Sequence, residues 1–244
     1  MSASVLSVLE STVLRKSPLH RVHLAAGGTM IESELGEAVG VYRSEITDRE
    51  AAAHLGLVDL CLQPRSGFKG GGSSDYLRTF SIDLPSGPNR ARFLSEGVLV
   101  SQLSFDEYLL LETTSEACNT ARAASQAWSM EDTRDCYEVP RQDSHGCLAV
   151  VGAQAANTLS SLISVDLRSQ HFENLFVAQT LLNEVSVIVI RQDLGFLPNF
   201  FLLADISAME YLWTVLLDAM GEDGGAAVGL EAFHWIQSGS AGLS

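Results

Sequence analysis

The sequence VDLRSQHFENLFVAQTLLNEVSVIVIRQD, residues 165–193, and the sequence FFLLADISAMEYLWTVLLDAM, residues 200–220, decide the fold class. In Val185–Arg191, β-branched apolar residues occupy both alternating sets of positions. This pattern is typical of a strand that is buried on both faces and lies inside a sheet. In the second stretch, Ser207 and Glu210 have the spacing of a capping box, and apolar residues then recur at helical spacing. Together the two stretches predict an interior strand followed by a helix that covers the sheet.

The same order of elements occurs twice along the chain. Helical and alternating apolar patterns predict a strand, a helix, a strand pair and a further helix in each half. The expected elements outside the first segment are a helix capped by Thr47 and Glu50, strands at 57–63, 98–103, 108–112 and 147–151, a helix capped by Thr113 and Glu116 that ends near Trp128, and a helix at 153–162. We therefore predict an α+β protein of two similar lobes, each a mostly antiparallel sheet covered by helices.

The polar run Ser129–Pro140 is the expected connection between the lobes. It separates residues 1–128, the N-terminal lobe, from residues 129–244, the C-terminal lobe. A chain of 244 residues with 46% apolar and 18% charged residues can form a sizeable core. The two lobes are expected to pack so closely that they also count as one domain.

The charge of the chain excludes several partners. The formal net charge is −15, and beyond Arg141 only Arg168 and Arg191 are basic, against eleven Asp and Glu. Such a charge repels nucleic-acid phosphates and anionic lipids. No run approaches the roughly 20 apolar residues that span a bilayer, and the first residues lack a signal-peptide pattern. We expect a cytoplasmic protein with no nucleic-acid and no membrane partner.

Three other patterns predict structure and no chemistry. The four cysteines are far apart and form no metal-ligand motif, so we expect buried, reduced thiols and no metal. The glycine-rich Gly67–Ser74 lacks the residue order of a phosphate-binding loop and predicts a turn before a short helix at Asp75–Phe80. Asp143, Ser144 and His145 have the residue types of a catalytic triad, but adjacent residues do not normally converge on one reacting atom.

Four stretches carry a resemblance to a known family. They are SPLHRVHLAAGGTMIE at 17–32, VGVY at 39–42, AAAHLGLVDLCL at 51–62 and VGLEAFHWIQSG at 228–239. They resemble motifs of the glycine-cleavage T-protein (aminomethyltransferase) family and its folate-binding relatives. The segment at 163–220 is most similar to the gamma subunit of heterotetrameric sarcosine oxidase. The resemblance implies the T-protein fold, a place in one-carbon metabolism, and tetrahydrofolate as a candidate cofactor.

The resemblance also implies three folate contacts and the loss of the catalytic group. Tyr42, Glu112 and Arg191 lie where the family has folate-binding positions, although the family has an asparagine in place of the glutamate. A hairpin aspartate acts in the family on the folate side of one-carbon transfer, but no acid lies between Gly97 and Phe105 here. Without a base at the transfer site the family's chemistry loses a main part, so no catalytic residue is expected.

Two functions follow from this resemblance. The first is a non-catalytic, gamma-subunit-like protein that serves sarcosine oxidase-type amine oxidation, with flavoenzyme subunits or a second copy as its partner. The second is an aminomethyltransferase-like enzyme or a tetrahydrofolate-binding protein. The helix at 207–220 bears on this choice, because Tyr211 and Trp213 fall outside its expected core face. Trp213 contacts either the other lobe or a partner protein.

Overall fold

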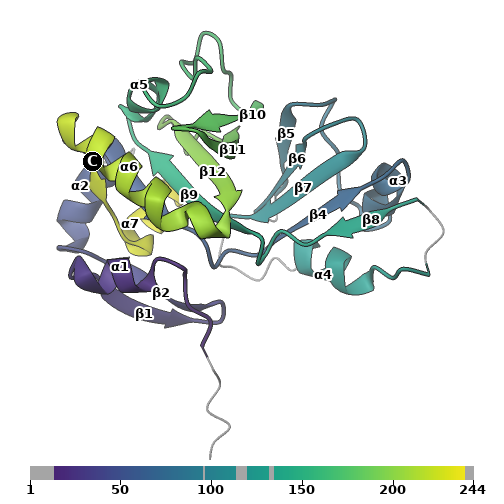
Figure 1. Cartoon of the computed structure of the whole chain (residues 1–244), viewed down its shortest axis with the longest axis horizontal. Coiled ribbons are helices and arrows are strands. Elements are labelled where there is room, and N and C mark those ends of the chain that lie inside the picture. Colours follow the sequence, from purple (N-terminus) through teal and green to yellow (C-terminus); the bar gives the residue numbers. More distant parts are fainter. Residues whose placement is uncertain (1–13, 96, 114–119, 132–134, 240–244) are drawn as a thin grey trace, which may run out of the picture.

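The structure, a computed structural model, describes residues 14–95, 97–113, 120–131 and 135–239. Two sheets form its centre, and helices cover their outer faces (Figure 1). The larger sheet has six strands in the order β10-β11-β12-β9-β3-β13, antiparallel except for β13 beside β3. Its strands are β3 (Gly56–Asp59), β9 (His145–Val151), β10 (Val177–Leu182), β11 (Val185–Arg191), β12 (Asn199–Asp205) and β13 (Ala226–Ala227).

The smaller sheet has five strands in the order β5-β6-β7-β4-β8, and all its neighbours are antiparallel. Its strands are β4 (Arg65–Lys69), β5 (Arg90–Phe93), β6 (Val98–Gln102), β7 (Glu107–Glu112) and β8 (Tyr137–Val139). A separate antiparallel hairpin consists of β1 (Thr29–Ser33) and β2 (Gly36–Val41). The α+β class with mostly antiparallel sheets is therefore confirmed.

The helices lie on the outside of these sheets and beside the hairpin (Figure 1). They are α1 (His20–Ala25), α2 (Glu45–Leu55), α3 (Ser73–Arg78), α4 (Thr120–Ala127), α5 (Ala155–Ser160), the 3₁₀ turn η1 (Ile206–Ala208), α6 (Met209–Glu222) and α7 (Leu230–Gln237). Helix α7 packs directly on β2, because a Cβ at Gly229 would lie only 1.9 Å from the Gly40 carbonyl oxygen. Only glycine permits that approach of two backbones.

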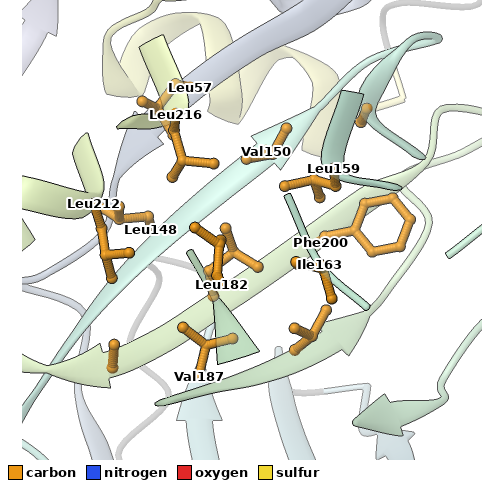
Figure 2. Close-up of a cluster of buried hydrophobic side chains, with 14 of the residues drawn as sticks. Leu57, Leu148, Val150, Leu159, Ile163, Leu182, Val187, Phe200, Leu212 and Leu216 are labelled. Atoms are coloured by element: carbon orange, nitrogen blue, oxygen red, sulfur yellow. The ribbon is translucent and has the colours of Figure 1, made fainter. Parts of the chain in front are cut away.

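Strand β11 is buried on both faces, as its sequence predicts. Val187 and Val189 point into a core beneath α5 and α6, where Leu212 of α6 meets the strands (Figure 2). Ile188 and Ile190 point into a second core that is shared with the smaller sheet and with α2 and α7. A third core lies between the smaller sheet and the helices α3 and α4. The larger sheet therefore has no solvent-facing surface along its central strands.

Two of the three predicted capping boxes are wrong in detail, and the third, Thr113 with Glu116, lies partly outside the described residues. Ser207 lies inside η1, where its N–H donates to the Asp205 carboxylate, and α6 begins two residues later without a side-chain cap. The N-cap of α2 is Ser44, whose hydroxyl accepts from Thr47 N–H, so this helix begins earlier than expected. In both places an upstream polar side chain takes the first free N–H group before the predicted residue does.

Two predicted loops contain strands. β4 extends through Gly67 to Lys69, so the first part of the expected turn belongs to this strand. The helix that follows is Ser73–Arg78 instead of the expected Asp75–Phe80. β8 falls inside the expected connection Ser129–Pro140 and pairs with β4. The polar composition of β8 reflects its place at the edge of the sheet, where water solvates one side of the strand.

Each sheet takes one strand from the other side of the expected lobe boundary. β3, from residues 1–128, lies between β9 and β13 in the larger sheet. β8, from residues 129–244, closes one edge of the smaller sheet. The division into lobes at 128 and 129 stays a prediction, and this exchange of strands ties the two parts together.

Trp213 contacts the same chain. It is 2% exposed, and its ring lies edge-on to the His23 ring with the centroids 5.0 Å apart. Tyr211 is half exposed, and its hydroxyl accepts a hydrogen bond from Asn183. Helix α6 therefore supplies no evidence for a partner through Trp213.

Strand β10 forms one edge of the larger sheet, and neighbouring segments hold both of its ends. Val177 N–H donates to Asn89 O, and Asn183 N–H, directly after the strand, donates to Leu162 O. The Gln179 side chain donates to Leu103 O of the smaller sheet at 2.9 Å. The open part of this edge is therefore short.

We expect Ile190→Ala to reduce the free energy of unfolding by about 2–5 kcal/mol, because it removes buried methyl groups and leaves a cavity. Urea denaturation measures this change. Leu181→Ala, at an exposed position of β10, serves as the control and should change stability by less than about 0.5 kcal/mol. A loss below about 1 kcal/mol for Ile190→Ala would contradict two-sided burial of the strand.

Candidate functional site

Tyr42 belongs to a buried polar network that joins α1, β2 and β3. Its hydroxyl lies 2.6 Å from His23 Nδ1, and His23 Nε2 lies 2.8 Å from an Asp59 carboxylate oxygen. The Ser17 hydroxyl donates to the same oxygen of Asp59. His23 is fully buried, so its two ring nitrogens depend on these partners. The network ties the N-terminal segment to the larger sheet.

The electrostatics of this network favour one charge state for each acid. Burial raises the pKa of Asp59, but the hydrogen bond and charge of His23, with bonds from Ser17 and Cys61, outweigh it and hold the pKa below its usual range. Burial, followed by the charge of Asp59, raises the pKa of Tyr42. At neutral pH the carboxylate is therefore an acceptor and the phenol keeps its proton.

Glu112 caps a helix from inside the protein. It lies at the end of β7, is 2% exposed, and accepts a hydrogen bond from Ala121 N–H in the first turn of α4 at 3.1 Å. Burial raises its pKa, while the N–H groups of Ala121 and Arg122 and the Arg122 charge oppose that shift. A carboxylate at this end of a helix satisfies N–H groups that lack partners within the helix.

Arg191 is engaged by its own surroundings at the end of β11. Its Nε and Nη2 atoms donate to the two carboxylate oxygens of Asp193 at 2.8 and 2.9 Å. Its Nη1 donates to Phe172 O at 2.5 Å. Arg191 therefore joins the turn between β11 and β12, through Asp193, to the loop before β10, through Phe172 O.

The three predicted folate contacts do not come together. Tyr42 follows β2, Glu112 ends β7 and Arg191 ends β11, and the described residues give them no shared hydrogen-bond partner. Each polar group is engaged by a different internal partner. Whether any one of them contacts a folate stays a prediction.

Arg65, which the sequence does not single out, is the most unusual charged residue of the fold. It lies at the start of β4, is 4% exposed, and forms no ion pair with any carboxylate among the described residues. Burial lowers the pKa of its guanidinium, and the charge of Arg15 acts in the same direction. The N–H groups of its guanidinium donate to main-chain oxygens only, those of Cys61, Gln63, Arg141, Gln142 and His145.

A second arginine, Arg141, lies beside it between β8 and β9. Its Nη2 donates to Glu107 at 2.6 Å, and Lys69 donates to the other oxygen of the same carboxylate at 3.1 Å. Its Nη1 lies 2.8 Å from His145 Nε2, which must accept because a guanidinium only donates. Burial and the charges of Arg141 and Arg65 lower the pKa of His145, so this imidazole is neutral.

The residues Asp143, Ser144 and His145 form no triad. His145 Nδ1 lies 2.8 Å from the Ser144 hydroxyl, but Asp143 pairs with Arg15 and does not contact the imidazole. The hydroxyl of Ser144 in turn donates to Pro140 O. No acid therefore orients this histidine as a general base, in agreement with the sequence.

A cavity of about 430 Å³ opens beside these arginines. We call it the arginine cavity, after four lining side chains, Arg15, Arg65, Arg122 and Arg141. The acids that line it are Glu34, Glu138 and Asp143. Segments far apart in sequence meet here: the β1–β2 turn, the β3–β4 connection, α4 and the stretch from β8 to β9. Only the folded topology brings them together.

No helix within the described ranges is long and apolar enough to cross a membrane. Within the same ranges, no three His, Cys, Asp or Glu side chains are placed to hold a metal ion. Cys61 and Cys147 are free, buried thiols, and Cys136 is buried as well. Cys61 and Cys147 lie in different cores, on opposite faces of the larger sheet, so they are not placed to form a disulfide bond.

We expect Asp59→Asn to destabilise the protein most near neutral pH. Because the folded-state pKa of Asp59 lies below the unfolded value of about 3.9, its contribution is present above that pH and is lost as pH falls through the folded-state pKa. Urea denaturation from pH 7 to pH 3 measures the difference from the parent protein, which should shrink below about pH 4. Exposed Asp83→Asn is the control, and an equal pH dependence in both variants would contradict the role of the network.

No protein-family model matches the sequence, and no curated protein matches it significantly. Two solved structures resemble it in fold. The first is the glycine cleavage system aminomethyltransferase T from Bartonella henselae, with 18% identity and a TM-score of 0.71 over 92% of this chain and 62% of that chain. The second is a chain of the heterotetrameric sarcosine oxidase from Corynebacterium sp. U-96, with 19% identity and a TM-score of 0.62 over 88% of this chain and 98% of that chain. This chain spans about 62% of the aminomethyltransferase, and it has the fold that these two proteins share.

Proposed function

We propose that this protein is a non-catalytic member of the T-protein fold that assembles, like the gamma subunit of sarcosine oxidase, with the subunits of an amine-oxidising flavoenzyme. The observation that carries the proposal is that the three residues expected to contact folate form hydrogen bonds within the chain. Glu112 caps α4, Arg191 holds Asp193, and Tyr42 pairs with His23. Side chains that are engaged in this way hold the fold together.

The hairpin that would carry the family's catalytic acid supports the same conclusion. The first strand of this hairpin, β6, and the residues around it include no acid between Gly97 and Phe105. At the tip, the Phe105 side chain is 88% exposed, and the Asp106 carboxylate accepts a hydrogen bond from the Ser104 hydroxyl. A carboxylate at this exposed tip is not held in a fixed position against a ligand, as positional catalysis requires.

The structural match to a chain of a heterotetramer supports a role in an assembly. The match covers 98% of that chain of the sarcosine oxidase. An assembly partner would supply the flavin and the chemistry of amine oxidation. This protein would supply a rigid structural unit.

We expect the protein to form no methylene-tetrahydrofolate from an aminomethyl-lipoyl carrier, because it lacks the acid between Gly97 and Phe105. A coupled absorbance assay with an authentic aminomethyltransferase as the positive control measures this. A turnover of about 1 per second or more would contradict the proposal.

We expect the affinity-tagged chain, expressed in its native host, to purify with other polypeptides in fixed stoichiometry and with visible flavin absorbance. Size-exclusion chromatography with light scattering gives the mass of the complex, and sarcosine-dependent peroxide release tests its activity. A single monomeric species without flavin, or a homo-oligomer alone, would overturn the assembly with a flavoenzyme.

A tetrahydrofolate-binding protein is the second candidate, and the higher TM-score to the aminomethyltransferase favours it. Fluorescence titration with a reduced folate distinguishes the candidates. Saturable binding by the isolated chain, weakened in Tyr42→Phe but not in Tyr211→Phe, would favour the folate-binding alternative.

A further inference from the structure

We propose that the arginine cavity binds a small ligand through a carboxylate group. The proposal stands apart from the assembly with a flavoenzyme, because it concerns residues that are not used there. Arg15, Arg65, Arg122 and Arg141 line one cavity of a chain whose formal net charge is −15. Guanidinium groups are the preferred protein partners of carboxylates, since their N–H groups match both oxygens.

The ion pairs around the cavity leave positive charge without a partner. Arg141 and Lys69 share the single carboxylate of Glu107. Arg15 pairs with Asp143, and Arg65 forms no ion pair within the described part of the chain. Of these four cations, three contact two carboxylates and Arg65 contacts none among the described residues. Keeping such an excess in a partly buried place is unfavourable, and an incoming anion would relieve it.

Two of the guanidiniums are held close together by main-chain oxygens. Arg15 Nη2 and Arg65 Nη2 both donate to Gln142 O, each at 3.1 Å. Arg65 N–H also donates to the Gln142 side chain at 2.9 Å. The carbonyl groups position the arginines without cancelling their charge. Burial lowers the pKa of the Arg65 guanidinium most, and the nearby charge of Arg15 acts in the same direction. The cavity wall thus carries its positive charge before any ligand arrives.

The charge of the lining favours a carboxylate over a phosphate. Four arginines face three acids, Glu34, Glu138 and Asp143, which leaves one positive charge. A singly charged carboxylate balances that excess, whereas a dianionic phosphate would exceed it and meet repulsion from the acids. The volume of about 430 Å³ lies within the range of small-molecule sites, roughly 300–1,000 Å³.

The test uses the full chain and isothermal titration calorimetry with three monocarboxylates, benzoate, hexanoate and lactate. Benzamide is the neutral match of benzoate, and inorganic phosphate is the second anion. We expect saturable binding of at least one carboxylate, with phosphate and benzamide weaker by about tenfold or more, because hydrogen bonds to a charged group contribute roughly 1.5–3 kcal/mol.

A matched pair of variants locates the binding. Arg122 lies exposed on α4 at the cavity, so Arg122→Gln should keep the fold and weaken carboxylate binding by about tenfold. Arg78→Gln, on α3 and outside the cavity lining, is the control and should leave binding unchanged. Circular dichroism confirms that both variants fold.

Four results would overturn the proposal. They are the absence of saturable binding of all three carboxylates, equal binding of benzoate and benzamide, tighter binding of phosphate, and unchanged carboxylate affinity in Arg122→Gln. If the proposal holds, a crystal structure with the tightest-binding of the three carboxylates shows the ligand oxygens against Arg65, Arg122 or Arg141.

Discussion

Burial of the larger sheet on both faces is the constraint on which the rest of the structure depends. Strands β9, β11 and β12 have almost no position that faces water, so each side chain must fit an apolar neighbour. The constraint reaches the backbone at Gly146, where a Cβ would lie 2.2 Å from the sulfur of Met209. The start of α6 can therefore rest directly on the start of β9, and the helix covers the core beneath it.

Polar groups that enter this apolar framework are completed within the chain. Asp59, His23 and Tyr42 satisfy one another beneath α1, and Arg65 is surrounded by carbonyl groups at the start of β4. Without such partners each buried group would be unfavourable by several kcal/mol. A polar residue at a family site position is thus weak evidence for a ligand, because the fold itself requires partners for its buried polar groups.

The sequence predicts the features of this fold that depend on local patterns. Two-sided β-branched runs identify β11 and its place inside the sheet. The helix starts are predicted less well, since neighbouring Ser, Thr and Asp side chains compete for the same N–H groups, as Asp205 and Ser44 show. The arginine cavity cannot be predicted from local patterns, because its lining residues are distant in sequence. Arg65 and Arg141 are 76 residues apart, and nothing local indicates that the Arg65 side chain reaches the Arg141 carbonyl oxygen.

The edge of the larger sheet has a consequence for how this protein behaves at high concentration. An unpaired strand edge is a template on which another chain can add a strand and begin to aggregate. Here the main-chain oxygens of Asn89 and Leu162 hold its two ends, and Gln179 anchors its middle to the smaller sheet. The few open positions are too short to start a stable intermolecular ladder. This edge of the larger sheet is therefore protected from pairing with the edge of another molecule.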